Sequence, residues 1–314
     1  MKYNTLGKTG IEVSALTIGA WQLGGPLFFD GKPDGHPDPG KENVFRMIHE
    51  LGDCGVNAID TAEQYSNGES ERRVGEALKG RRDKWIVSTK FGYRVGPNNT
   101  REDDSTPPTI LRSLEGSLRR LGMHHIDVFL YHCAPNVEDL DAGREILERA
   151  KEQGKIRAYG ISTNNTELVR EMIAAKTIDV LQFATSLLEP AAEVSALANE
   201  SGIGTQLRGV MAQGRLSGKY FHTPAAWRAD DNRMRITGDD FAKYAAFEPL
   251  IPEGYTMAQV ALRWALDQPG HHTICLGAKN IADYRAAVAA LELPPLSAET
   301  RSALETCAQS FRSA

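Results

Sequence analysis

Four side chains with complementary acid–base chemistry fall at, or just after, the ends of expected β-strands. Asp60 closes the segment NAID, Lys90 closes WIVSTK, His132 follows DVFLY, and Tyr65 lies five residues after Asp60. A carboxylate, an ammonium group, an imidazole and a phenol on one rim could protonate an oxyanion as it forms, or take the proton back. A hydride donor would have to supply the other half of such a reaction.

The charges of these four side chains determine which proton transfers they can carry out. A phenol has a pKa of about 10 and is a poor acid at neutral pH. Two unit charges 4 Å apart interact by about 4 kcal/mol at an effective dielectric of 20, and one pKa unit is about 1.4 kcal/mol. We therefore expect Lys90 to lower the pKa of Tyr65 by one to a few units, Asp60 to keep Lys90 charged, and His132 to orient a carbonyl oxygen. Metal binding is the other use of Asp and His together, but Lys and Tyr are poor ligands and no second His has ligand spacing, so no metal site is expected.

The elements that would position these residues alternate along the chain. Short β-branched segments predict eight strands, and helical periodicity fills the intervals between them. In one such interval Leu111, Leu114, Leu118 and Leu121 line one helix face. Ser105 and Thr106 are its candidate caps, Pro107 and Pro108 lie in its first turn, and Gly122 stops it. The expected strands are 16–20, 57–62, 85–90, 127–132, 158–162, 180–185, 204–209 and 273–278, and the other expected helices are 44–51, 71–78, 140–150, 168–175 and 257–266.

Eight βα units without a composition break favour a single closed (β/α)₈ barrel domain over residues 1–314. The alternative is a doubly wound open sheet, which would normally carry a GxGxxG fingerprint after its first strand. The segment IGAWQLGGPLFFDG is glycine-rich but lacks that spacing. Residues 3–15 predict a hairpin before the first barrel strand. The long polar segments 94–106 and 221–240 both follow strands, so they are expected to be lids or binding loops over the catalytic rim, with a surface insertion as the alternative.

Composition narrows the class of protein. The 314 residues are 41% hydrophobic, with a net charge of −5 and a pI near 5.9. This balance does not indicate nucleic acid or anionic membrane as a partner. No apolar run approaches the roughly 20 residues of a membrane span, and the N-terminus lacks the apolar stretch of a signal peptide. Four scattered cysteines without CxxC spacing are typical of free thiols in a reducing compartment, so a cytoplasmic protein is expected.

At these residues the chain resembles the aldo-keto reductase superfamily over essentially its full length. The resemblance is carried by NAIDTAEQYSNGESE, the strand-end Lys90, DVFLYH, GAWQLGG and AQGRLSGKY. It implies that Tyr65 is the general acid, that Lys90 lowers its pKa, that Asp60 pairs with Lys90, and that His132 orients the substrate carbonyl. It further implies reduction of an aldehyde or ketone, and a monomer.

The resemblance also implies a nicotinamide dinucleotide extended across the barrel mouth. Thr163 is inserted into the usual Ser-Asn pair, Thr185 replaces the usual stacking Tyr, and Val210 replaces the usual Pro. The residues expected to contact the cofactor are Ser162, Asn164, Gln182, Arg208, Met211, Gly214, Leu216, Ser217, Gly277, Lys279 and Asp283.

Preference between the two dinucleotides depends on the segment after the eighth strand. Gly277 allows close approach and Lys279, at a helix start, suits a 2′-phosphate, which favours NADP(H). Asp283 adds a negative charge there, and Ala287 stands where the family has an adenine-binding Asn, so NAD(H) is the alternative.

For the substrate, four aromatic side chains are expected to form an apolar wall beside His132: Trp21, Phe28, Phe29 and Tyr93. The polar 94–106 segment would also suit a sugar-like ligand. Three alternatives to carbonyl reduction stay open. They are an NAD-dependent sugar or alcohol dehydrogenase working in the oxidative direction, a cofactor-binding regulatory protein like the potassium-channel beta subunits, and a lyase using Lys90 as a Schiff-base amine.

Overall fold

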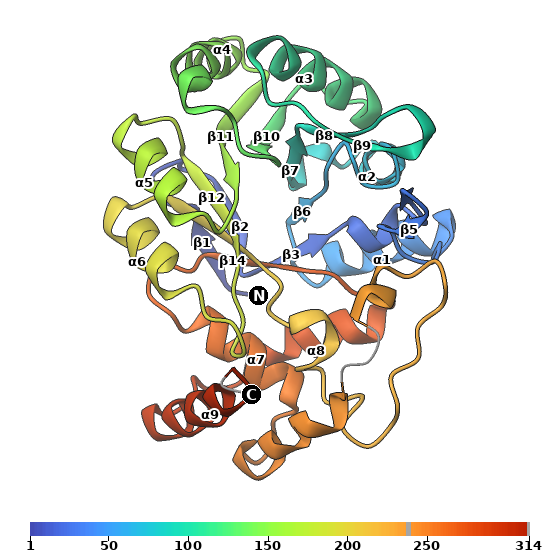
Figure 1. The fold of residues 1–314 in the computed structure, drawn as a ribbon, viewed down its shortest axis with the longest axis vertical. Helices are drawn as coiled ribbons and strands as arrows, with labels where there is room; N and C mark the ends of the chain where they lie inside the picture. Colours follow the sequence, from blue (N-terminus) through green and yellow to red (C-terminus); the bar gives the residue numbers. More distant parts are fainter. Residues whose placement is uncertain (237–239, 313–314) are drawn as a thin grey trace.

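The computed structural model describes residues 1–236 and 240–312, which form a closed barrel of eight parallel strands inside a ring of helices (Figure 1). The (β/α)₈ prediction is therefore confirmed, and each expected strand is present. Around the barrel the strands are β3 (Leu16–Gly19), β6 (Ala58–Asp60), β7 (Ile86–Phe91), β10 (Ile126–Tyr131), β11 (Ile156–Ser162), β12 (Val180–Ala184), β13 (Gly204–Arg208) and β14 (Thr273–Leu276), which pairs with β3.

The expected helices are also present, and α3 (Pro107–Leu121) shows what the pattern could and could not predict. Its prolines lie in the first turn, and Gly122 ends it with a left-handed φ of 63°. Thr106 is the N-cap residue, as expected, but neither candidate side chain caps the helix, because the Thr106 hydroxyl donates to Asp104 and that of Ser105 to Cys133. Leu111 is also misplaced: it is 51% exposed, and Ile110 takes its place in the core. The others are α1 (Lys41–Asp53), α2 (Glu69–Ala77), α4 (Leu140–Glu152), α5 (Thr166–Ala174) and α7 (Met257–Leu266).

Two further helices have no counterpart among the expected elements, α6 (Ala192–Ser201) and α9 (Ala298–Ser310), and of α8 (Ile281–Ala290) the sequence predicted only the start, near Lys279. Each is rich in alanine and lacks the bulky apolar stripe that reveals a helix by its period. Within the described ranges, no helix combines the length and the apolar character needed to cross a bilayer.

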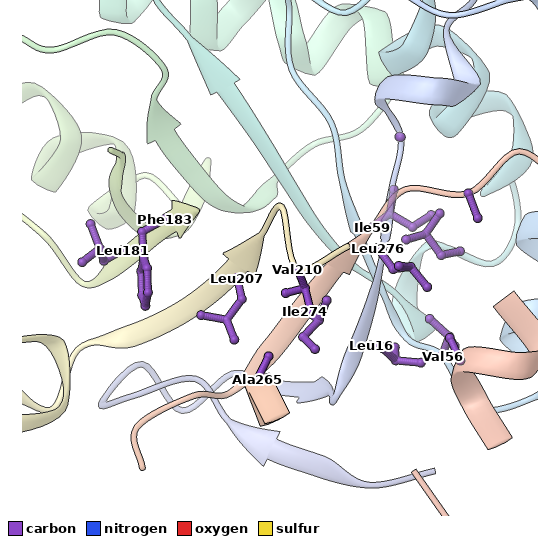
Figure 2. Close-up of a cluster of buried hydrophobic side chains, with 14 of the residues drawn as sticks. Leu16, Val56, Ile59, Leu181, Phe183, Leu207, Val210, Ala265, Ile274 and Leu276 are labelled. Carbon is purple, nitrogen blue, oxygen red and sulfur yellow. The ribbon is translucent and has the colours of Figure 1, made fainter. Parts of the chain in front are cut away.

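Alternation along the strands separates two cores. Side chains such as Ile59, Leu181, Phe183, Leu207 and Ile274 point outward to the helices and form the larger core (Figure 2). The residues between them point inward. A second cluster fills the N-terminal end of the barrel interior. In it, Leu6, Ile11 and Val13 contact strand residues; these three belong to the hairpin of β1 (Tyr3–Thr5) and β2 (Glu12–Ser14). The hairpin prediction is confirmed, and its side chains plug the N-terminal end of the barrel.

Loops build up the opposite, C-terminal rim. After β3 the chain forms the small hairpin of β4 (Phe28–Phe29) and β5 (Lys32–Pro33). The polar segment after β7 is itself a hairpin, of β8 (Tyr93–Val95) and β9 (Arg101–Asp103). The long segment after β13 includes the 3₁₀ turns η5 (Ala212–Gly214) and η6 (Asn232–Ile236). Of the expected 221–240 loop, residues 237–239 lie outside the described part of the chain.

Candidate active site

Lys90 is fully buried at the C-terminal end of the barrel interior, and its ammonium group joins the other candidate catalytic residues. Its Nζ donates to Asp60 Oδ2 at 2.8 Å, to the carbonyl oxygen of Thr61 at 2.7 Å and to the Tyr65 hydroxyl at 3.1 Å. The edge of the His132 ring packs against the Tyr65 ring, with centroids 5.8 Å apart. The structure thus brings together all four residues that the sequence singles out.

Strand register explains this convergence. Asp60 pairs with Ser88, and Lys90 lies two residues further along β7, so both side chains point into the barrel. Lys90 pairs with Leu130, and His132 lies two residues beyond Leu130 on the same face. Tyr65 follows in the loop after β6, where its backbone N–H donates to the carbonyl of Ala62.

The electrostatics of this cluster differ in one respect from the sequence expectation. Burial raises the pKa of Tyr65 above 10, although the Lys90 ammonium opposes that effect. The expected net lowering of the Tyr65 pKa is therefore wrong for the protein without a bound ligand. Burial also disfavours the charged form of Lys90, but Asp60 and Tyr65 outweigh it and hold the pKa of Lys90 above its usual value. The result is a protonated phenol beside a permanent cation, a pair suited to proton donation.

His132 is held in its neutral form. Burial, together with the cations Lys90, Arg208 and Arg101, places its pKa well below 6.5. Its Nδ1 is buried without a hydrogen-bond partner among the described residues. A neutral imidazole with an unused buried nitrogen is suited to orienting a polar group of a ligand by hydrogen bonding, not to acting as a cation.

Two predicted cofactor residues are hydrogen-bonded to this cluster. The Ser162 hydroxyl donates to Gln182 Oε1 at 3.0 Å, and Gln182 Nε2 donates to Asp60 Oδ1 at 3.0 Å. Sequence reasoning missed Gln206, whose Oε1 accepts from Gln182 and from Ser88. A glutamine at an inward position of a barrel strand was the available signal.

The predicted substrate wall is only partly formed. Trp21 stacks on Tyr65 with centroids 5.9 Å apart, and Tyr93 packs on His132 at 4.9 Å. Phe28 is exposed and Phe29 is buried in the β4–β5 hairpin, and in the described chain neither ring contacts those of Trp21, Tyr65 or His132. The wall therefore consists of Trp21 and Tyr93.

Asn164 and Arg208 are two predicted cofactor contacts whose side chains have different surroundings. Both polar ends of the Asn164 side chain are engaged by the backbone of Ala184, at 2.7 and 2.8 Å. Arg208, at the end of β13, is exposed, and its guanidinium makes no hydrogen bond or ion pair within the described residues. Arg208 ends β13 two residues beyond Gln206 and on the same face, so it lies at the barrel mouth, where its charge acts on Tyr65 and His132.

The predicted pyrophosphate loop is tightly turned. Gly214 has a φ of 104°, which a glycine adopts without strain. The Ser217 hydroxyl donates to the Gly214 carbonyl, and Met211 caps η5. Leu216 is fully buried, and its backbone N–H donates to the Met211 carbonyl. Leu216 therefore anchors this loop to the core and has no free polar group for a phosphate.

The segment expected to decide between NADP(H) and NAD(H) carries paired charges. Lys279 donates to the buried carboxylate of Asp231, and Asp283 accepts from Lys219 at 2.6 Å. At Gly277, a Cβ atom would lie 2.3 Å from the Gln22 side-chain amide, so a larger residue there would require Gln22 to move. Sequence reasoning missed Asp231 and Gln22, although the polar character of the 221–240 segment had marked it as a rim loop.

These groups fit an extended dinucleotide. The guanidinium of Arg208 suits a pyrophosphate, and the buried Nδ1 of His132, which has no hydrogen-bond partner in the part of the chain that the structure describes, marks an open polar position at the reacting end. Ser162, Gln182, Arg208 and the loop of Met211 and Gly214 would hold such a group across the mouth. The usual stacking ring is absent: Thr185 is buried, and its hydroxyl accepts from the Ala191 N–H.

Comparisons with known proteins agree with this geometry. A sequence model of the aldo/keto reductase family matches residues 15–309. Aldo-keto reductase YhdN of Bacillus subtilis is 30% identical over 293 residues, covering 89% of this chain and 86% of that protein. The NADH-specific methylglyoxal reductase of Escherichia coli is 30% identical, covering 93% and 94%. The holo form of aldo-keto reductase AKR11C1 from Bacillus halodurans superposes with a TM-score of 0.83 at 28% identity, covering 98% and 96%. The chain belongs to the aldo/keto reductase family.

Proposed function

We propose that this protein reduces a small aldehyde or ketone to an alcohol, with a nicotinamide dinucleotide as partner. The observation that carries the proposal is the placement of Lys90 Nζ between Asp60 and Tyr65, at 2.8 and 3.1 Å. This arrangement fixes a protonated phenol beside a buried cation at the barrel mouth. Such a pair stabilises negative charge on a nearby oxygen and then protonates it.

Each residue has a defined part in that reaction. His132, as a neutral imidazole, orients the carbonyl oxygen toward the Tyr65 hydroxyl. Tyr65 transfers its proton from Oη to that oxygen as the C–O bond becomes single. Lys90 stabilises the resulting phenolate, and Asp60 keeps Lys90 in position. When bound, the reduced nicotinamide supplies the hydride that the carbonyl carbon accepts.

The proposal also concerns which of the two dinucleotides, NADPH or NADH, the protein binds. Lys279 favours NADP(H) in the sequence, but its ammonium group is paired with Asp231 in the folded protein. One relative is named an NADH-specific methylglyoxal reductase, which supports NADH and a small carbonyl compound as reactants. We propose that the protein accepts both dinucleotides, with the NADPH preference expected from Lys279 weakened by Asp231.

The test combines binding with turnover. Calorimetric titrations with NADPH and NADH measure affinity, and loss of absorbance at the nicotinamide band measures reduction of methylglyoxal and a panel of aldehydes and ketones. Tyr65→Phe should lower turnover about 10²–10⁴-fold with nearly unchanged cofactor affinity. Near wild-type turnover in that variant would disprove the proton-donor role. Tight binding without turnover on any carbonyl would favour a regulatory protein instead.

A further inference from the structure

Asp231 lies at the centre of a charge cluster beside the expected adenine end of the cofactor. Its side chain is only 2% exposed and contacts three basic residues. Its Oδ2 accepts from Lys279 Nζ and from Arg233 at 2.8 Å, and Oδ1 lies 3.4 Å from His36 Nδ1. Burial alone would raise the pKa of Asp231, but these basic partners hold it well below 3.8. Asp231 is therefore a carboxylate at neutral pH.

The cluster joins three separate parts of the rim. Asp231 belongs to the long segment after β13, Lys279 follows β14, and His36 follows β5. The segment is fixed by the backbone hydrogen bond from Asn232 N–H to the Gly35 carbonyl at 2.8 Å. In Figure 1 this orange part of the chain passes beside β5, and η6 packs against that strand. Asp231 is thus held beside Lys279 by contacts that do not involve Lys279 itself.

The other cations near the start of α8 are also paired with carboxylates. Lys219 donates to Asp283 at 2.6 Å, and Arg285 donates to Glu50 at 2.7 Å. Lys279 is half-buried in the folded protein. Burial lowers its pKa, although Asp231 opposes the effect. A phosphate group arriving here would meet a Lys279 charge already engaged by a fixed carboxylate, which Lys279 shares with Arg233.

We propose that Asp231 is a specificity-determining residue that disfavours the 2′-phosphate of NADP(H). The inference rests on the proposed function and names the regulator of its cofactor choice. A 2′-phosphate must displace the Asp231 carboxylate from Lys279 or bind next to it, and both cost free energy because like charges meet. NAD(H) carries a hydroxyl group at this position and avoids that cost. Specificity here comes from a repulsive group built into the site.

The test uses Asp231→Asn, with Asp230→Asn as the matched control. This control substitution removes the same charge from the same segment. Asp230, however, pairs with Arg228 at 3.0 Å and not with Lys279. Titrations with NADPH and NADH give the ratio of the two affinities. Asp231→Asn should shift that ratio about tenfold toward NADPH while NADH affinity stays within about twofold. Asp230→Asn should change the ratio by less than about twofold.

Lys279→Met supplies a second test, and in the wild-type background its result does not depend on the fold of the Asp231 variant. Because Lys279 is already engaged, its loss in the wild-type background should weaken NADPH by less than about threefold. In the Asp231→Asn background the same change should remove the gain in NADPH affinity, which a double-mutant cycle detects.

Several outcomes would overturn the inference. If Asp231→Asn left the ratio of the NADPH and NADH affinities unchanged, or weakened both affinities equally, the role of Asp231 would be only structural. An NADPH-specific loss of about tenfold or more in Lys279→Met alone would show that Asp231 does not neutralise Lys279 toward phosphate. If the wild type and all variants bound neither dinucleotide, the proposed function itself would fail and the inference with it, a result distinct from an unchanged ratio.

Discussion

The side-chain amide of Gln182 donates a 3.0 Å hydrogen bond from Nε2 to Oδ1 of Asp60. The other oxygen of that carboxylate accepts from Lys90 at 2.8 Å, so both sides of Asp60 are fixed. Because Asp60 positions Lys90 and Lys90 contacts Tyr65, Gln182 is connected to the proposed proton donor through two intermediate residues. Gln182 is therefore a positioning residue in addition to an expected cofactor contact.

Gln182→Met tests this role. The substitution keeps the side-chain length but leaves Asp60 Oδ1 without a donor, which costs about 1–3 kcal/mol. A fall in kcat of about tenfold or more is expected. The alkaline limb of the pH–rate profile should also move to higher pH, because a less neutralised Asp60 opposes Lys90 and raises the Tyr65 pKa further. Ser88→Ala is the control: it removes a hydrogen bond to Gln206 in the same interior without touching Asp60. Equal effects of both variants would show that only packing is involved.

The pH dependence of reduction follows from the states of Tyr65 and His132. Tyr65 must be protonated to donate, and burial keeps its pKa above 10. The pKa of His132 lies well below 6.5, so His132 stays neutral throughout the neutral range. We expect kcat/KM for reduction to be flat from about pH 6.5 to about pH 9 and to fall only as the phenol ionises. The reverse oxidation needs the phenolate, so its rate should rise over the same alkaline range.

Lys90→Met is the companion variant for that profile. Loss of the ammonium group removes the main effect that opposes burial at Tyr65, so its pKa should rise, the alkaline limb should move to higher pH and the rate should fall. An acid limb near pH 6 that disappeared in His132→Gln would contradict the assignment of His132 as a neutral residue.

Arg120 carries a stability prediction, because it faces two buried carboxylates from the loop and helix that follow β6. Its Nε donates to Glu71, which is fully buried, and its Nη2 lies 3.7 Å from Glu63. Arg120→Gln should lower the free energy of unfolding by about 3 kcal/mol, since it leaves buried charge without its partner. Lys155→Gln removes the half-exposed pair with Glu115 and should cost less than about 1 kcal/mol.

The pH dependence of that loss has a definite sign. Burial holds the pKa of Glu63 above 4.5 in the folded protein, and Arg120 opposes this shift. Without Arg120 the folded-state pKa rises further, so the folded variant binds a proton more tightly than the unfolded chain does. The deficit relative to wild type should therefore be largest near pH 8 and shrink toward about pH 5. Denaturant unfolding at both pH values measures it, and a deficit that grew on acidification would contradict the role of Glu63.

The barrel and the four candidate catalytic residues could be predicted because their signals are local. Asp60 and Lys90 end short apolar strands, and inward alternation then brings them together without knowledge of any distant contact. The Gly122 stop of α3 is likewise a property of a few neighbouring residues. By contrast, Leu111 and Ile110 both fit a helix, and only the position of the neighbouring strands decides which of the two is buried.

The errors at the site arise from contacts between distant segments. The pKa of Tyr65 rises because Trp21 and His132 enclose its ring, an effect that no pairwise charge estimate from sequence contains. Lys279 suggested a free cation, but its partner Asp231 comes from a loop 48 residues away. The expected NADP(H) preference rested on Gly277, the helix start and the Lys279 charge, so it could not include the Asp231 carboxylate that pairs with Lys279.

Arg208 provides a prediction that contrasts with Asp231. Its guanidinium is exposed, lies near Tyr65 and His132, and has no partner in residues 1–236 or 240–312. If it binds the pyrophosphate common to both dinucleotides, Arg208→Gln should weaken NADPH and NADH equally, by about tenfold. The salt dependence of binding should also become shallower, because one charge contact is lost. Arg170→Gln, which removes the same charge from the surface pair with Glu193, should leave both affinities unchanged. Unequal weakening of the two dinucleotides would place Arg208 near the adenine end instead of the pyrophosphate.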